Sequence, residues 1–252
     1  MISRTECLLY LETILEPDKF QDYCPNGLQV AGIEQINTLV TGVTASQELL
    51  DAALVLKADT ILVHHGYFWR GDDPRIIGIK QRRLKQLLMH DVNLIVYHLP
   101  LDAHSVMGNN AQLAKRLGIE IKGTIPETGD PNIALYGYLE SPVTAVDFVD
   151  KISCVLQRKP LFIEGHNRPI KNIGWCSGAA QAYIEQAAKL GLDAFISGEI
   201  SEQTVHLARE LGIHYFSAGH HATERYGVQA LGEHLAEKFD LQHHFIDINN
   251  PV

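Results

Sequence analysis

Apolar and polar positions alternate along the first part of the chain in a pattern typical of an α/β fold. Nearly continuous apolar runs at residues 36–43, 58–66 and 92–99 predict strands. Apolar positions at helical spacing over residues 46–58 and 82–91 predict helices between these strands. Strands that alternate with helices in this way indicate a largely parallel sheet with helices packed on its faces.

The same alternation starts again further along the chain. The stretch TGVTASQELLDAALVLKADTILVHHG aligns with WCSGAAQAYIEQAAKLGLDAFISGEI at an offset of 134 residues, which pairs Asp59 with Asp193. Shared patterning alone produces some apolar matches between two such units. We nevertheless predict two similar α/β lobes, each with a largely parallel sheet flanked by helices, over residues 1–122 and 172–252. Residues 123–171, where turn-forming residues interrupt the rhythm, form a smaller middle segment.

Histidine and carboxylate side chains gather where three of the predicted strands end. The three clusters are His64 with His65; His98, Asp102 and His104; and His220, His221 and Glu224. Ligands of open α/β sheets bind beyond the carboxyl ends of the strands, and neutral imidazole with carboxylate oxygen suits zinc, iron or manganese. His220 and Glu224 are also close enough in sequence to share one face of a helix. The clusters therefore indicate a metal site.

The same histidines also have an ordinary interpretation. Consecutive strand residues point to opposite faces, so His64 and His65 can share a site only if the chain turns directly after them, which Gly66 would permit. Histidine pairs also arise by chance, and a lone histidine is more often a surface or core residue than a ligand. Spacing alone leaves these roles open, and it does not choose between His220 and His221.

Several motifs of the chain resemble one known family. The stretches CPNGLQVAG, TGVTASQ, ILVHHGYFW, YHLPLDAH, DAFISGE and AGHHATERYGVQAL are together similar to the NIF-three-like family, whose bacterial members are called type 2 homologues of GTP cyclohydrolase I. The likeness runs from about residue 20 to the C-terminal INNPV and is weakest in the middle segment. The chain departs from the family pattern at one place near the expected rim of the pocket, since many relatives have Trp-Asp-Asn where this chain has Cys24, Pro25 and Asn26.

The resemblance implies a dinuclear metal centre that lies between the two lobes at the ends of their strands. Carried over position by position, the ligands would be His64, His65, Asp102, His220 and Glu224, with Glu224 bridging or nearly bridging the ions. The cofactors would be two divalent ions per chain, with iron, zinc and manganese not distinguished. The resemblance also implies a ring-shaped homo-hexamer as the assembly.

The function we expect is that of a metal-dependent hydrolase in which the ions activate water. The substrate would be a nucleotide or a phosphorylated small molecule, by resemblance to the GTP cyclohydrolase type 2 homologues, although no GxxxxGK[ST] loop is present. Glu199, the repeat counterpart of His65, is a candidate base, while Asn26 and Arg70 are candidate substrate-binding residues. The alternative is a non-enzymatic hexameric scaffold or regulatory protein in a stress or DNA-damage response, whose metals are structural.

Composition narrows the partners and the compartment. Thirty acidic residues against 21 basic ones give a net charge of −9, which disfavours a general nucleic-acid binder without excluding a local basic channel. No apolar run approaches the ~20 residues needed to span a bilayer. The four cysteines form no CxxC pair. We therefore expect a cytoplasmic protein with a small-molecule substrate and no membrane partner.

Overall fold

The computed structural model describes residues 1–252, which divide into two compact units. Unit 1 comprises Met1–Leu101 and Gly227–Asn249, and unit 2 comprises Asp102–Tyr226 and Asn250–Val252. Both units combine helices with a sheet, which confirms the predicted α/β class. The division of the chain at residues 122 and 171 stays a prediction. None of the helices is long and apolar enough to cross a membrane.

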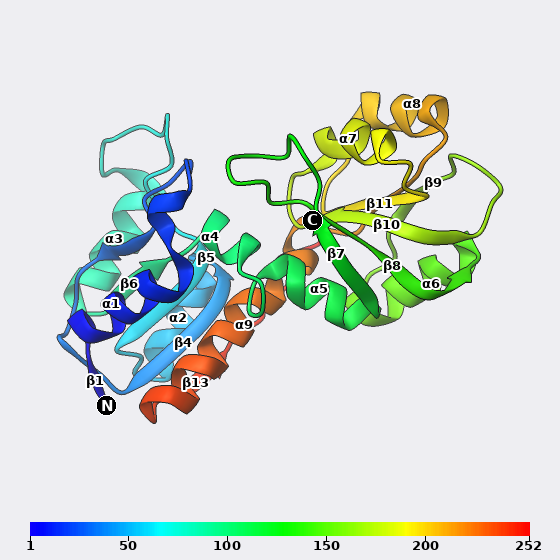
Figure 1. The fold of residues 1–252 in the computed structure, drawn as a ribbon. Coiled ribbons are helices and arrows are strands. Elements are labelled where there is room, and N and C mark those ends of the chain that lie inside the picture. Colours follow the sequence, from blue (N-terminus) through cyan, green and yellow to red (C-terminus); the bar gives the residue numbers. More distant parts are fainter. The chain divides into compact units, whose positions relative to one another are not determined.

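Unit 1 contains a five-stranded sheet, whose strands can be followed in Figure 1. In spatial order the strands are β13 (Gln242–Phe245), β4 (Thr38–Thr44), β5 (Thr60–His65), β6 (Asn93–Val96) and β2 (Gly27–Val30). All neighbours are parallel except β2, which runs antiparallel to β6. The helices α2 (Gln47–Val55) and α3 (Gly78–Met89) connect the parallel strands β4, β5 and β6. This order confirms the β-α-β-α-β pattern that the sequence predicts.

The remaining elements of unit 1 lie at the two ends of its sequence. They are β1 (Ile2–Ser3), α1 (Arg4–Leu15), the 3-10 helix η1 (Pro17–Lys19) and β3 (Gln35–Ile36), together with part of α9 (His220–Phe239). Strands β4 and β5 are buried along almost their whole length, as expected where helices cover both faces of a parallel sheet. Ile61 and Val63 of β5 pack with Leu49 and Leu50 of α2 in one apolar core.

Unit 2 contains a six-stranded mixed sheet (Figure 1). In spatial order its strands are β7 (Ile119–Thr124), β8 (Leu135–Val143), β10 (Ile170–Cys176), β11 (Ala194–Ser197), β12 (His214–Ser217) and β9 (Leu161–Ile163). Strands β10, β11 and β12 are parallel, and the other pairs are antiparallel. The helices are α5 (Asn109–Leu117), α6 (Ala145–Leu156), η2 (Gln181–Tyr183), α7 (Ile184–Lys189) and α8 (Glu202–Leu211). The short helix α4 (Leu99–Ala103) crosses the boundary between the units.

The internal repeat is present in the hydrogen bonding of the two units. In unit 1 the carboxylate of Asp59, just before β5, accepts the backbone N–H groups of residues 37–38 at 2.8 Å each. In unit 2 the carboxylate of Asp193, just before β11, accepts the N–H groups of residues 171–172 at 3.1 and 2.8 Å. Donors and acceptors are both related by the offset of 134 residues. An aspartate therefore ties the start of one parallel strand to the start of the next in each unit.

A buried histidine begins β12 in unit 2. His214 is 1% exposed, and its Nδ1 atom accepts the backbone N–H of Gly165 at 3.2 Å, which requires an unprotonated nitrogen. The ring of His166 lies 3.9 Å from it between centroids. Burial and the neighbouring His166 lower the pKa of His214 from 6.5 to about 4. The folded chain therefore keeps this imidazole neutral.

We expect His214 to make the free energy of unfolding depend on pH. Its pKa is lower in the folded than in the unfolded chain, so its contribution is complete above pH 6.5 and is lost as the pH falls towards about 4. The loss across this window is on the order of 3 kcal/mol. Urea unfolding of metal-free protein at several pH values would measure it. His214→Gln should flatten the pH profile, whereas His206→Gln, at an exposed histidine, should not.

Candidate metal centre

His64 and His65 end strand β5 in unit 1. His64 is fully buried, and the two ring centroids are 4.7 Å apart. The Nδ1 atom of His64 donates to the carbonyl oxygen of Tyr97 at 3.0 Å, because a carbonyl can only accept. The Nδ1 atom of His65 lies 3.1 Å from the hydroxyl oxygen of Thr44. In both rings Nε2 is therefore the nitrogen suited to bind a metal.

Gly66 is needed here for close packing. A Cβ atom at this position would stand 2.3 Å from Cγ2 of Val96 and 2.5 Å from Oε1 of Gln29. Oε1 of Gln29 also accepts the backbone N–H of Tyr67 at 2.7 Å. The glycine thus lets the chain pass close to its neighbours directly after the two histidines.

His98, which the resemblance leaves outside the ligand set, lies beside the two histidines of β5. Its ring centroid is 5.0 Å from that of His64 and 5.7 Å from that of His65. One possible ligand atom from each of the three residues lies within 4.8 Å of the others. The indole ring of Trp69 contacts the ring of His98 edge to face, with centroids 5.0 Å apart. Unit 1 therefore brings three imidazoles together.

Two carboxylates are buried close together in unit 2. Asp102 is 5% and Glu224 2% exposed, and a ligand oxygen of each lies within 4.8 Å of the other. The amide of Asn109 and the hydroxyl of Ser177 each donate to Oδ1 of Asp102 at 2.9 Å. Two carboxylates so close in a buried place have lost much of their hydration, so a cation between them would be strongly favourable. The donor set therefore fits a divalent metal ion.

His220 opens helix α9 beside Glu224. Its Nε2 atom lies 3.2 Å from Oε2 of Glu224, one helical turn away, as the spacing predicts. Its Nδ1 atom donates to Oε1 of Glu199 at 2.7 Å. Burial lowers the pKa of His220, but the two carboxylates outweigh it and raise the pKa to about 9. Glu199, the candidate base, is thus placed where it orients His220.

The other residues singled out from the sequence have partners within their own unit. The amide of Asn26 donates to Oδ2 of Asp22 at 2.9 Å and accepts the backbone N–H of His98 at 2.8 Å. Arg70 is exposed and donates to the carbonyl oxygen of Asp22 at 3.2 Å. A substrate-binding role for Asn26 and Arg70 stays a prediction. The backbone N–H of His221 donates to the carbonyl oxygen of Val252 at 3.0 Å.

The sequence patterns did not single out two residues that lie next to these clusters, Asp22 and Gly178. Asp22 holds His98 through a 2.6 Å contact between Oδ1 and Nδ1. Gly178, with a φ of +63°, lies so close to Glu224 that a Cβ atom would stand 2.2 Å from Oε1. The Gly178 in CSGAA does carry a weak signal, because a glycine after a strand marks a turn or a close approach. Asp22 carries none.

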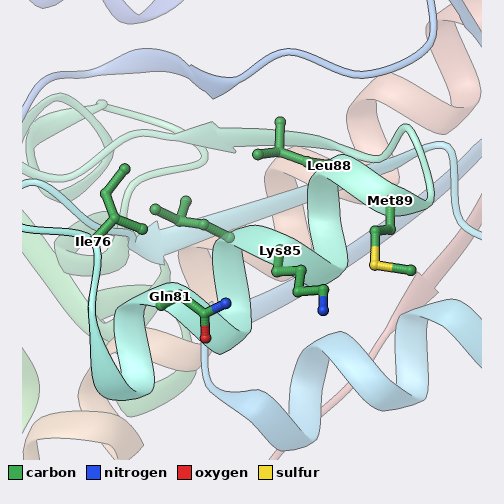
Figure 2. Close-up of a pocket in the computed structure, with 6 residues that line it drawn as sticks. Ile76, Gln81, Lys85, Leu88 and Met89 are labelled. Carbon is green, nitrogen blue, oxygen red and sulfur yellow. The ribbon is translucent and has the colours of Figure 1, made fainter.

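A separate apolar groove runs along helix α3 (Figure 2). It has a volume of about 350 Å³, and its walls include Ile76, Leu84, Leu88 and Met89, with Gln81 and Lys85 as the polar members. No histidine, cysteine or carboxylate lines it, so this groove is not the metal site.

The fold and these side chains define the class: an α/β protein with clusters of histidine and carboxylate groups that could hold metal ions. The chain belongs to the Duf34/NIF3 (NGG1p interacting factor 3) family, which it matches over residues 2–251. This confirms the resemblance noted in the sequence.

Individual relatives match over almost the whole chain. The "GTP cyclohydrolase 1 type 2 homolog" of Pseudomonas aeruginosa is 55% identical over 239 residues, 94% of each chain. The protein of the same name from Vibrio cholerae is 54% identical over 244 residues, 96% of each chain. A solved structure of the protein ybgI, described as of unknown function, is 49% identical, covers 100% of both chains and has a TM-score of 0.96.

Proposed function

We propose that this protein is a metal-dependent hydrolase that acts on a nucleotide or a phosphorylated small molecule. The observation that carries the proposal is the pair of buried carboxylates, Asp102 and Glu224, beside the imidazole of His220. Such a pair matches the donor set of divalent ions that catalyse hydrolysis. The name shared by the relatives supports a guanine nucleotide as one member of the substrate panel.

The ligands in this proposal hold two divalent ions, with iron, zinc and manganese all compatible with the donors. They are His64, His65, Asp102, His220 and Glu224. Bound ions of this kind polarise the bond under attack and lower the pKa of water to about 7. The chain's own groups fix the ligands: Asn109 and Ser177 orient Asp102, and Glu199 holds the Nδ1 proton of His220.

We expect hydrolysis to follow metal occupancy. Chelator-treated protein should lose turnover of a panel of nucleotides and phosphoesters, and reloading with one of the three metals should restore it. The rate should also rise with pH as the activated water ionises. Phosphate release, with nucleotide products separated by chromatography, would measure both effects.

A different set of results would contradict the hydrolase proposal. If the metal-loaded protein turns over no substrate, while its assembly or partner binding follows metal occupancy, the chain is a scaffold or regulator. We also propose that the chains assemble as a homo-hexamer. Light scattering of the metal-loaded and metal-free protein would test this assembly and its dependence on metal.

A further inference from the structure

His98 lies beside His64 and His65, two residues after the end of strand β6. The three rings lie within 5.7 Å of one another between centroids, and their possible ligand atoms lie within 4.8 Å. Tetrahedral ligation at a metal–nitrogen distance of about 2.1 Å needs nitrogens roughly 3.4 Å apart. The ligand nitrogens must therefore move closer together when a metal binds.

The three imidazoles also share one pattern of hydrogen bonding. Each Nδ1 atom contacts an oxygen of unit 1: the Tyr97 carbonyl for His64, the Thr44 hydroxyl for His65 and the Asp22 carboxylate for His98. A histidine that binds a metal commonly donates its other ring nitrogen to a carboxylate or carbonyl in this way, because the contact fixes the tautomer and the ring orientation. In His98 this leaves Nε2 as the ligand atom.

Asp22 is itself held firmly. Its side chain is 4% exposed, and it accepts hydrogen bonds from the amide of Asn26 at 2.9 Å and the backbone N–H of Leu99 at 3.0 Å. A carboxylate accepts hydrogen bonds from a ring N–H, so Nδ1 of His98 donates to Oδ1 of Asp22.

We propose that His98 is a third imidazole ligand, offered by unit 1 to a divalent ion beside His64 and His65, and that Asp22 is the residue that positions it. The inference rests on the proposed function, because it needs a metal centre in this protein. It adds to that centre a ligand that the family resemblance does not include. It also gives Asn26 a role, since this amide braces both Asp22 and the backbone of His98.

The test measures metal binding by the full-length chain and not turnover. His98→Gln should bind Zn²⁺ at least about 10-fold more weakly in competition with a chromophoric chelator. Asp22→Asn should weaken binding by about 10-fold to 100-fold, the range for residues that orient ligands. X-ray absorption of the Zn²⁺ protein, loaded to the same occupancy, should show one imidazole fewer in His98→Gln. His206→Gln, at an exposed histidine that pairs with Glu202, is the matched control.

The outcomes separate this inference from the function on which it rests. If wild type binds no Zn²⁺, Mn²⁺ or Fe²⁺, the proposed function fails. If wild type binds metal and His98→Gln keeps the same affinity and the same number of imidazoles, only this inference fails, and His98 ties the Asp22 loop to the strand end. Thermal melting of the metal-free variants shows whether each has folded. If His98→Gln does not fold, the imidazole count and affinity of Asp22→Asn carry the test, because unchanged values there also overturn the inference.

Discussion

Glu224→Gln is expected to remove most of the bound metal and to abolish metal-dependent hydrolysis while the fold stays intact. The substitution keeps the shape of a side chain that is only 2% exposed, but it removes one of the two buried negative charges. Altering residues that merely orient ligands already weakens metal binding by about 10-fold to 100-fold. Loss of an anionic ligand should therefore lower affinity by at least ~100-fold. Elemental analysis and the phosphate-release assay would measure the two effects.

The melting temperature gives this prediction a second readout. In the metal-free protein, Glu224→Gln removes a carboxylate that lies close to Asp102, but it also removes the contact of Glu224 with His220, and these two changes have opposite effects on stability. The decisive quantity is therefore the rise in melting temperature on adding metal, which should vanish in Glu224→Gln. Glu237→Gln, at an exposed position of the same helix, should leave this rise unchanged. A mutant that retains wild-type metal content would remove Glu224 from the ligand set.

Local patterns were sufficient to predict much of the fold. Strands β4 and β5 and helix α2 fall within or next to their predicted ranges, because apolar spacing marks them locally. Helix α2 ends at Val55, earlier than the pattern indicates, and Lys57 follows with a left-handed φ of +54°. The pairing of β13 with β4 joins Gln242 to Thr38 and has no local signal. Contacts so distant in sequence depend on how the whole chain packs.

In the candidate site, too, contacts between residues close in sequence could be predicted, whereas contacts between residues far apart in sequence could not. The contact of His220 with Glu224 follows from their spacing on one helix. The contact of Asp22 with His98 joins residues 76 positions apart, and neither residue has a neighbour in sequence that identifies the pair. Sequence spacing therefore found groups that could act as metal ligands, but it missed the Asp22 carboxylate that contacts His98.

Gly178→Ala is expected to damage the metal centre without touching a ligand. Gly178 has a φ of +63°, where an L-residue is strained by about 1–2 kcal/mol. The new Cβ atom would also stand 2.2 Å from Oε1 of Glu224 and 3.2 Å from Nε2 of His220. Because Glu224 is buried, its carboxylate has to shift and can no longer hold the same position. We expect Zn²⁺ affinity to fall by about 10-fold to 100-fold, measured by chelator competition.

Gly191→Ala provides the matched control for this substitution. Gly191 also has a left-handed φ, of +70°, but apart from its own neighbours in the chain no atom lies within 4 Å of the point that a Cβ atom would occupy. The two variants should therefore lose similar free energies of unfolding from backbone strain, whereas only Gly178→Ala should lose metal affinity. If the two variants bind metal equally well, the Glu224 carboxylate can move aside without a loss of metal affinity. Its observed position would then not be required for metal binding. A selective loss in Gly178→Ala would instead tie metal affinity to the space that this glycine leaves for the Glu224 carboxylate.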